Sequence, residues 1–114
     1  MKKLITTLLA LCLTTTASFS DVKLGIIIGF TGPIESLTPD MAAGAELAID
    51  EVNKSGSFSM GNVSGIRSYS TCIDSSAATA AAERLITSDK VNGIMGADCS
   101  GVTTAVLQNV ATAK

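Results

Sequence analysis

The sequence contains no histidine and no tryptophan, and aromatic residues make up only 4% of its 114 residues. Without histidine, the chain lacks the commonest metal ligand and the commonest general base, so catalysis would have to rest on Asp, Glu, Lys, Ser or Cys. A formal net charge of −2 argues against a nucleic-acid-binding protein, which would carry a basic patch. Hydrophobic residues reach 46%, which excludes an intrinsically disordered chain, and the length allows one domain at most.

The chain also lacks an apolar run long enough to cross a membrane. Its longest run, residues 4–13, has about ten residues, whereas a transmembrane helix needs roughly 20. This run follows two lysines and precedes a stretch of small residues that ends at Ser20, which is the layout of a secretory signal peptide. We therefore predict a signal peptide over residues 1–20, cleaved after Ser20 or, as the alternative, after Ala17.

The three cysteines of the sequence divide between the two predicted segments. Cys12 lies in the signal peptide, and a lipid anchor there is the weaker interpretation, because a bulky leucine precedes it where a small residue is expected. Cleavage leaves Cys72 and Cys99 in the mature segment, residues 21–114. An even pair of cysteines in an exported chain predicts a disulfide, and two buried free thiols are the alternative.

Strand and helix patterns alternate along the mature segment. Strands are predicted over residues 22–29, 66–71 and 91–96, and helices over residues 40–54, 74–88 and 101–113. The unbroken isoleucines at 26–28 predict a strand that is covered on both faces. Thr38 is the predicted N-cap of the first helix, Gly56 ends it, and Asp74 caps the second. The buried stripe of the first helix is predicted to contain Met41, Ala45, Ala48, Ile49 and Val52.

This alternation predicts an α/β fold, a three-layer Rossmann-like parallel sheet with right-handed crossovers. Two successive crossovers place the first strand centrally, in the order 2-1-3. The loops after the first and third strands then leave in opposite directions, and ligands bind at such a switch point, outside the carboxyl ends of the strands. The candidate binding loops are therefore residues 30–38 and 97–101.

The predicted sheet is small for a domain of its own. Three parallel strands would leave both edge strands unpaired, and residue 114 falls inside the pattern of the third helix. We therefore expect the chain to be the N-terminal part of a longer protein. A self-contained small domain is the alternative.

No phosphate-binding loop follows the first predicted strand. Residues 29–33 read Gly-Phe-Thr-Gly-Pro, which lacks the third glycine of a dinucleotide fingerprint. Pro33 also removes a backbone donor where a phosphate nest needs one, and the sequence has no Walker motif. We therefore predict no cofactor.

The loop at residues 97–101 is the most informative one, because Ser100 stands at the predicted start of the third helix. Backbone N–H groups and the helix dipole favour an anion there, and the Ser100 hydroxyl adds a donor, so the loop could hold a carboxylate. Ser100 could instead only cap the helix, and a nucleophilic role is disfavoured because no base is available. Asp98 could be a general acid or a ligand contact, or it could accept hydrogen bonds from loop amides. Glu35 and Asp40 could bind a cationic group or be solvated carboxylates.

Several of these segments resemble the Leu/Ile/Val-binding protein family, the substrate-binding proteins of branched-chain amino-acid ABC transporters. The resemblance lies in VKLGIIIGFTGPI at residues 22–34 and in the helix at 44–53, and again in Cys-x-Asp at 72–74 and Gly-Ala-Asp-Cys-Ser at 96–100. It implies a periplasmic, non-enzymatic protein with two lobes and the type I periplasmic-binding fold, of which residues 21–114 would form part of the first lobe. It also implies that the two cysteine positions can carry a disulfide.

The same resemblance implies which residues bind the ligand. Ser100 matches the serine whose hydroxyl and neighbouring backbone, here that of Gly101, hold the α-carboxylate. Leu37 matches a loop position, often aromatic in the family, that packs on the ligand side chain, so the leucine leaves the preferred side chain open. The expected partners are a small amino acid or amide ligand and the membrane permease of an ABC transporter, with no metal, no catalytic residue and no nucleic acid.

Two other functions are compatible with parts of the sequence. A sensory or receptor domain that binds a ligand with the same fold is the first. A secreted enzyme on a Rossmann-like scaffold is the second, and it is disfavoured because the chain has neither histidine nor a nucleotide fingerprint.

Overall fold

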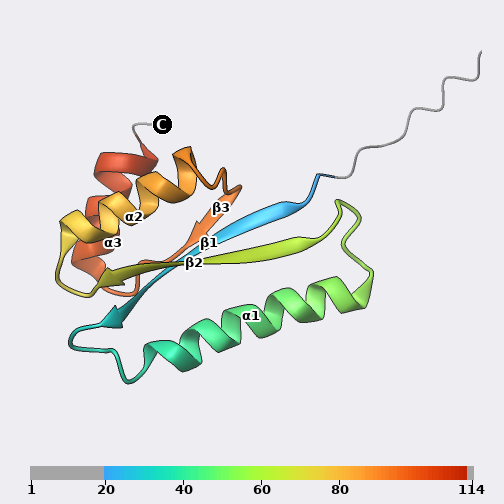
Figure 1. The fold of residues 1–114 in the computed structure, drawn as a ribbon, viewed down its shortest axis with the longest axis horizontal. Coiled ribbons are helices and arrows are strands. Elements are labelled where there is room, and N and C mark those ends of the chain that lie inside the picture. The colour runs from blue at the N-terminus through green and yellow to red at the C-terminus, as the bar shows by residue number, and fades with distance from the viewer. Residues whose placement is uncertain (1–19, 113–114) are drawn as a thin grey trace, which may run out of the picture.

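The chain folds as a three-stranded parallel sheet between two layers of helices, in a computed structural model that describes residues 20–112 (Figure 1). The elements in chain order are β1 (Val22–Thr31), α1 (Thr38–Ser55), β2 (Val63–Thr71), α2 (Ser75–Thr87), β3 (Gly93–Met95), α3 (Ser100–Val106) and the π-helical turn η1 (Leu107–Ala111). The predicted signal peptide lies outside the described residues, apart from Ser20 at its end.

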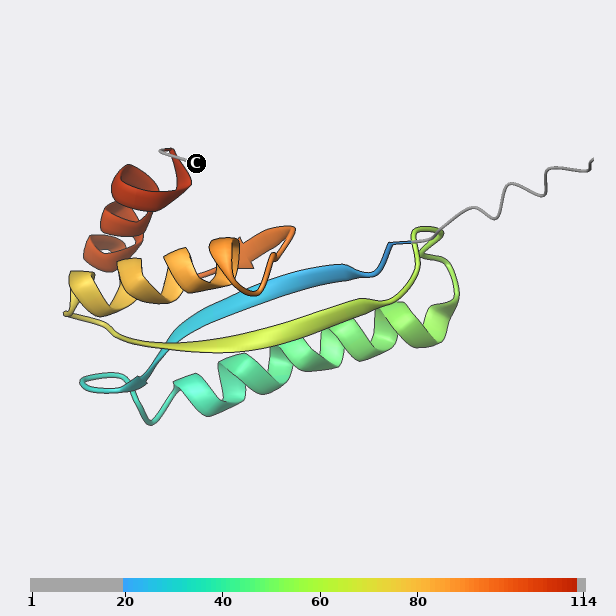
Figure 2. The ribbon, with the colours of Figure 1, turned by 45° about the horizontal axis from the view of Figure 1, so that its top comes forward.

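The sheet has the strand order β2-β1-β3, which confirms the predicted topology. β1 pairs with β2 along most of its length, from Val22 opposite Val63 onward, but with β3 only at residues 24–26. α1 covers one face of the sheet, and α2 and α3 cover the other (Figure 2). The first strand therefore lies at the centre, with a helical layer on each side, as the alternating pattern predicts.

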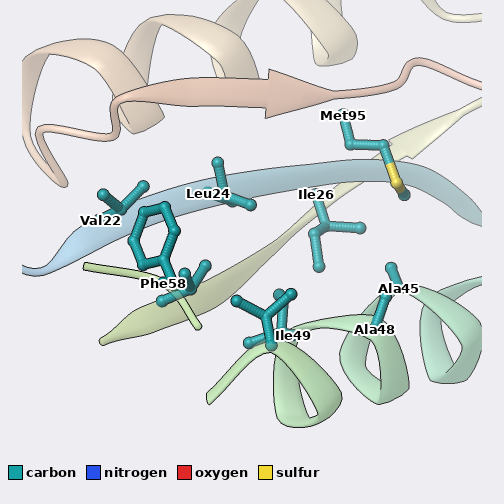
Figure 3. A pocket seen from close by; sticks show the side chains of 10 residues that line it. Val22, Leu24, Ile26, Ala45, Ala48, Ile49, Phe58 and Met95 are labelled. Atoms are coloured by element: carbon teal, nitrogen blue, oxygen red, sulfur yellow. The ribbon is translucent and has the colours of Figure 1, made fainter. Parts of the chain in front are cut away.

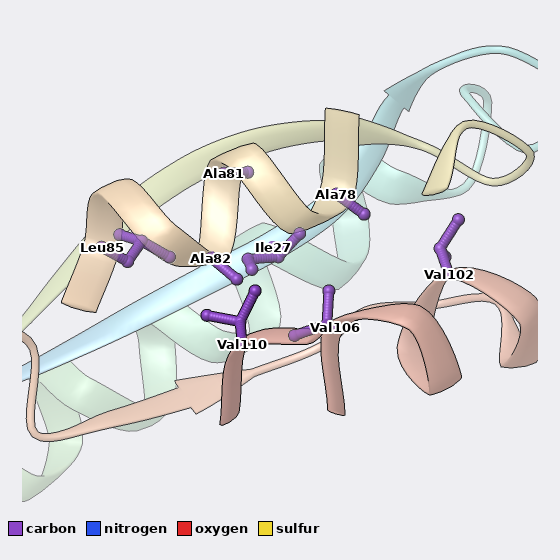
Figure 4. Close-up of a cluster of buried hydrophobic side chains, with 8 residues drawn as sticks. All are labelled: Ile27, Ala78, Ala81, Ala82, Leu85, Val102, Val106 and Val110. Atoms are coloured by element: carbon purple, nitrogen blue, oxygen red, sulfur yellow. The ribbon is translucent and has the colours of Figure 1, made fainter. Parts of the chain in front are cut away.

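The three consecutive isoleucines of β1 explain how one strand serves two cores. Successive side chains of a strand point to opposite faces. Ile27 therefore packs with the apolar faces of α2 and α3, and Ile26 and Ile28 pack with Ala42 of α1. Figure 4 shows the first of these clusters, in which the small side chains Ala78 and Ala82 bring α2 close to the sheet.

The N-terminus of α2 forms as predicted. Asp74 is the N-cap, and its Oδ1 accepts hydrogen bonds from the backbone N–H groups of Ser76 at 2.9 Å and Ala77 at 3.0 Å. The carboxylate thus satisfies two donors that have no partner within the helix. Gly56, with φ of 64°, also ends α1 as predicted.

The start of α1 differs from the prediction. Thr38 is not the N-cap: the cap is Leu37, which makes no side-chain capping bond, and Thr38 is fully buried as the first helical residue. Its hydroxyl donates to the carbonyl oxygen of Glu35 at 3.3 Å. The buried stripe also differs, because Ala42 is completely buried while Met41 is 46% exposed. The contact with Ile26 and Ile28 favours the smaller side chain at the sheet surface.

Several element boundaries also differ from the prediction. β1 continues to Thr31, β2 begins at Val63, and β3 is shorter than predicted, at Gly93–Met95. The third helix is interrupted, because α3 changes to the π-helical turn η1 at Leu107. None of these differences moves the carboxyl ends of the strands away from the candidate loops.

The sheet face beside α1 is only partly covered. A groove of about 480 Å³ runs along this face, lined by apolar side chains of β1, α1 and β3, among them Leu24, Ile49 and Met95 (Figure 3). Val52, which was predicted to be buried, borders this groove and is 38% exposed. No lining residue carries a polar side chain, so the groove offers nothing that could bind the charged end of a solute.

Candidate functional site

The loops that follow the three strands meet at one edge of the molecule. Because the strands are parallel, the β1–α1 loop (residues 32–37), the β2–α2 loop (residues 72–74) and the β3–α3 loop (residues 96–99) all leave from the carboxyl edge of the sheet. This edge lies at the left of Figure 1. Both candidate loops from the sequence therefore belong to the same surface.

A disulfide between Cys72 and Cys99 joins the β2–α2 and β3–α3 loops. β2 and β3 are not neighbours, and strands separated by a third strand lie about 9.6 Å apart, which is too far for a disulfide. The Cα atoms of the two cysteines are nevertheless only 5.2 Å apart. Both loops must therefore lean over the end of β1. The disulfide prediction is confirmed, and the alternative of free thiols is wrong.

Asp98 connects the β3–α3 loop to β1. Its Oδ2 accepts a hydrogen bond from the backbone N–H of Gly29 at 2.7 Å. Of the roles considered for Asp98, accepting from a backbone amide is therefore the one that the structure contains. Sequence reasoning did not identify Gly29 as its partner, because 69 residues separate the two.

Thr103 connects the first turn of α3 to the loop before it, and it is a second residue that the sequence did not point to. The Thr103 hydroxyl donates to the carbonyl oxygens of Ala97 at 2.8 Å and Cys99 at 2.9 Å. The Thr103 backbone N–H also donates to the carbonyl oxygen of Cys99, at 2.9 Å. The first turn of α3 is thereby fastened to the loop that precedes it.

Ser100 is the first residue of α3, and it is exposed. Cys99 is the N-cap and makes no side-chain capping bond, so the alternative that Ser100 only caps the helix is wrong. The Ser100 carbonyl accepts from the Thr104 hydroxyl at 2.8 Å, whereas its own hydroxyl has no hydrogen-bond partner within residues 20–112. Gly101 is also exposed, and a Cβ there would have no neighbour within 4 Å. The surface in front of both residues is open.

Leu37 stands at the start of α1, on the other face of the sheet from α3. Its side chain is 61% exposed, and its backbone N–H donates to the carbonyl oxygen of Ile34 at 2.9 Å. In the same loop Glu35 Oε2 accepts from the Gly32 backbone N–H at 3.4 Å, while Asp40 is exposed. Leu37 and Ser100 therefore flank the carboxyl end of β1 from opposite faces.

An ion pair between β2 and α1 lies outside these loops. Arg67 of β2 binds Glu46 of α1 through two hydrogen bonds, one of them 2.7 Å long between Nη2 and Oε2. This hydrogen bonding, followed by the charge of Arg67, lowers the pKa of Glu46. Within the described part of the chain no group of His, Cys, Asp and Glu side chains could hold a metal ion. The candidate residues themselves supply uncharged donors at Ser100 and Gly101 and an apolar side chain at Leu37.

Comparison with known proteins agrees with this arrangement. Residues 21–114 match the family model described as periplasmic binding protein. The chain belongs to this family. Leu/Ile/Val-binding protein homolog 7 of Brucella abortus is 33% identical over 89 residues, which are 78% of this chain and 22% of that protein. Homolog 8 of the same species is 36% identical over 81 residues, which are 71% of this chain and 20% of that protein.

The chain thus spans about a fifth of the length of these curated Leu/Ile/Val-binding relatives. The resemblance stated from the sequence is confirmed. Both relatives are solute-binding proteins rather than enzymes, and neither favours the sensory alternative. None of the helices within residues 20–112 combines the length and apolar character that crossing a membrane requires.

Two solved structures share the fold of this periplasmic binding protein chain. The branched-chain amino-acid substrate-binding protein LivJ from Streptococcus pneumoniae, in complex with isoleucine, superposes with a TM-score of 0.73 at 24% identity, over 82% of this chain and 27% of its own. An ABC-transporter solute-binding protein from R. palustris, in complex with 4-hydroxybenzoate, superposes with a TM-score of 0.68 at 22% identity. The match covers 82% of this chain and 25% of that protein. The type I periplasmic-binding fold is therefore shown.

Proposed function

We propose that this periplasmic binding protein captures a branched-chain amino acid, or a related small amino acid or amide, and delivers it to the membrane permease of an ABC transporter. The family supports a place outside the cytoplasm, and the predicted signal peptide over residues 1–20 supports the same place. The ligands named for the two solved relatives, isoleucine and 4-hydroxybenzoate, differ in every part except the carboxylate. We therefore expect the carboxylate to be the group that the described loops bind.

Ser100 and Gly101 are the residues that would hold this carboxylate. The first N–H groups of a helix have no partner within it, and Thr103 is the first residue of α3 whose N–H bonds back to the loop. The amides of Ser100 and Gly101 and the Ser100 hydroxyl thus remain as donors at one exposed place. A carboxylate that loses water on binding needs such donors in exchange.

Leu37 would contact the other end of the ligand. Its exposed aliphatic side chain stands on the opposite side of the β1 carboxyl end, so a ligand lying across this end could contact Leu37 and Ser100 together. The resemblance implies a second lobe that holds the ammonium group and closes over the ligand in a hinge motion. Contacts from both lobes would then favour the closed, bound state.

One observation carries this proposal: the Ser100 hydroxyl is exposed and has no partner in the described structure, yet Ser100 directly follows a loop that a disulfide fixes at Cys99. Serines at helix starts commonly use the hydroxyl for a cap or a turn, and the Ser100 hydroxyl does neither. Here the loop is held by other residues, which leaves the hydroxyl for an external acceptor.

The Ser100→Ala variant of the full-length exported protein tests the proposal. Loss of a hydrogen bond to a charged group should raise the Kd for L-isoleucine by about tenfold or more in calorimetric titration. Ser88→Ala is the matched control, because Ser88 is an exposed serine at the far end of α2 and should leave the Kd unchanged. Equal affinity of the Ser100→Ala variant and the wild type would refute the assignment of this residue.

A further inference from the structure

Asp98 follows β3 at the place where the pairing between β1 and β3 has ended, while β1 still pairs with β2. The ladder between β1 and β3 ends where Ile26 pairs with Met95. Gly29 lies three residues beyond this pair, and its N–H has no β3 carbonyl opposite it. The Asp98 carboxylate takes that role, with Oδ2 at 2.7 Å from the Gly29 nitrogen. A side chain thereby extends the contact between β1 and the chain that follows β3.

The fit around this hydrogen bond is tight. A Cβ added at Gly29 would lie 3.2 Å from Asp98 Oδ2 and 3.3 Å from the backbone nitrogen of Cys72. The absence of a side chain at Gly29 therefore lets the β2–α2 loop and the β3–α3 loop approach the end of β1 together. The second Asp98 oxygen, Oδ1, is shielded from solvent and has no hydrogen-bond partner within residues 20–112.

Because Oδ1 is shielded and Oδ2 bonds to Gly29, the Asp98 carboxylate faces the protein interior rather than a ligand. It is followed directly by Cys99, which the disulfide ties to Cys72. Consecutive residues are thus held at two different points, one by a hydrogen bond to β1 and one by a covalent bond to the β2–α2 loop. A single tether leaves a loop free to rotate about it, whereas two tethers fix its orientation.

We infer that Asp98 is a positioning residue for ligand binding: its bond to Gly29 fixes where Ser100 presents its hydroxyl and amide at the end of β1. This inference rests on the proposed function, because it assigns a role to Asp98 through Ser100. Donors that bind an anion must be held close to the productive geometry by the residues around them, and a displacement of about 1 Å is enough to lose much of their effect.

A double-mutant cycle on the full-length protein, with L-isoleucine as the probe, tests the inference. Asp98→Ala should raise the Kd by about tenfold, because the loop loses one of its two anchors. Asp98→Asn should stay within about threefold of the wild type, because its amide oxygen can still accept from Gly29. The Asp98→Ala/Ser100→Ala double variant should lose less affinity than the product of the two single losses, because the Ser100 hydroxyl that Asp98 positions is already missing and only the amides remain to be displaced.

The inference fails if Asp98→Ala binds L-isoleucine with wild-type affinity, or if Asp98→Asn and Asp98→Ala lose the same affinity. It also fails if the increases in Kd from Asp98→Ala and Ser100→Ala multiply in the double variant. Should Asp98→Ala fail to fold, Gly29→Ala replaces it, because its Cβ would push the carboxylate away, and wild-type affinity of that variant also refutes the inference. Val110→Ala, which removes a buried side chain of η1, controls for general destabilisation and should leave the Kd unchanged. If Val110→Ala loses as much affinity for L-isoleucine as Asp98→Ala does, the positioning role of Asp98 is likewise refuted.

The cycle also separates this inference from the proposed function. If Ser100→Ala itself binds L-isoleucine as tightly as the wild type, the proposed carboxylate site is wrong, whatever Asp98 does. If Ser100→Ala binds weakly while Asp98→Ala binds normally, the site stands and only the positioning role of Asp98 fails.

Discussion

Removal of the Cys72–Cys99 disulfide should cost this protein a large part of its stability. The bridge closes a segment with a sequence separation of 27 residues, which contains all of α2 and β3. The chain-entropy relation for a loop of this size gives about 3.6 kcal/mol at 25 °C, through restriction of the unfolded chain. Domains unfold with only about 5–15 kcal/mol, so the double variant Cys72→Ala/Cys99→Ala should be much less stable.

The assay is equilibrium unfolding in urea, with oxidised wild type and the double alanine variant compared on the same probe. The free energy of unfolding should fall by about 3 kcal/mol or slightly more. Dithiothreitol provides the control, because it should bring the wild type to the level of the variant and leave the variant itself unaffected. A difference below about 1 kcal/mol would refute the reasoning, because the bridge would then not restrict the unfolded chain as the relation requires.

Two further predictions concern the packing of the sheet and its surface charges. Gly25→Ala should destabilise the fold by about 1–3 kcal/mol, because the new Cβ would lie 2.6 Å from Cδ1 of the buried Leu85. Gly44→Ala, with nothing within 4 Å of its Cβ, should instead stabilise α1 by about 0.5–1 kcal/mol, and urea midpoints distinguish the two. The Arg67 hydrogen bond lowers the pKa of Glu46, so this pair stabilises the fold above the ordinary carboxyl pKa of 4.5 and loses its effect as the pH falls through the lowered pKa. The difference in Tm between wild type and Glu46→Gln should therefore shrink from about pH 7 to about pH 3, and a constant difference would contradict this account.

The architecture could be predicted from the sequence because it is set by local patterns. The unbroken isoleucines of β1 signalled burial on both faces, and the structure divides them between two cores. Asp74 signalled a helix start because a carboxylate satisfies free N–H groups wherever a helix begins. The order of strands then followed from chain connectivity and the handedness of crossovers, without knowledge of any particular contact.

The orientation of α1 could not be predicted in the same way. A helical spacing shows that one face is apolar, but the sheet decides which residues of that face lie deepest. Ala42 rather than Met41 meets Ile26 and Ile28, and Thr38 is drawn into the interior instead of capping the helix. These choices depend on how closely two elements approach, and that distance is a property of the packed pair.

The candidate site depends both on local sequence patterns and on contacts that form only between packed elements. Ser100 could be singled out from the switch point and from the resemblance, but an acidic neighbour two residues before a carboxylate site argues against it on charge alone, because like charges repel. The structure removes this conflict: Asp98 turns its carboxylate toward the Gly29 N–H, and its other oxygen is shielded from solvent. The same side chain that would repel an anion from the surface thus anchors the loop from the interior. No pattern within β1 or the β3–α3 loop predicts the hydrogen bond between Gly29 and Asp98, because that bond forms only once β1 and β3 lie side by side.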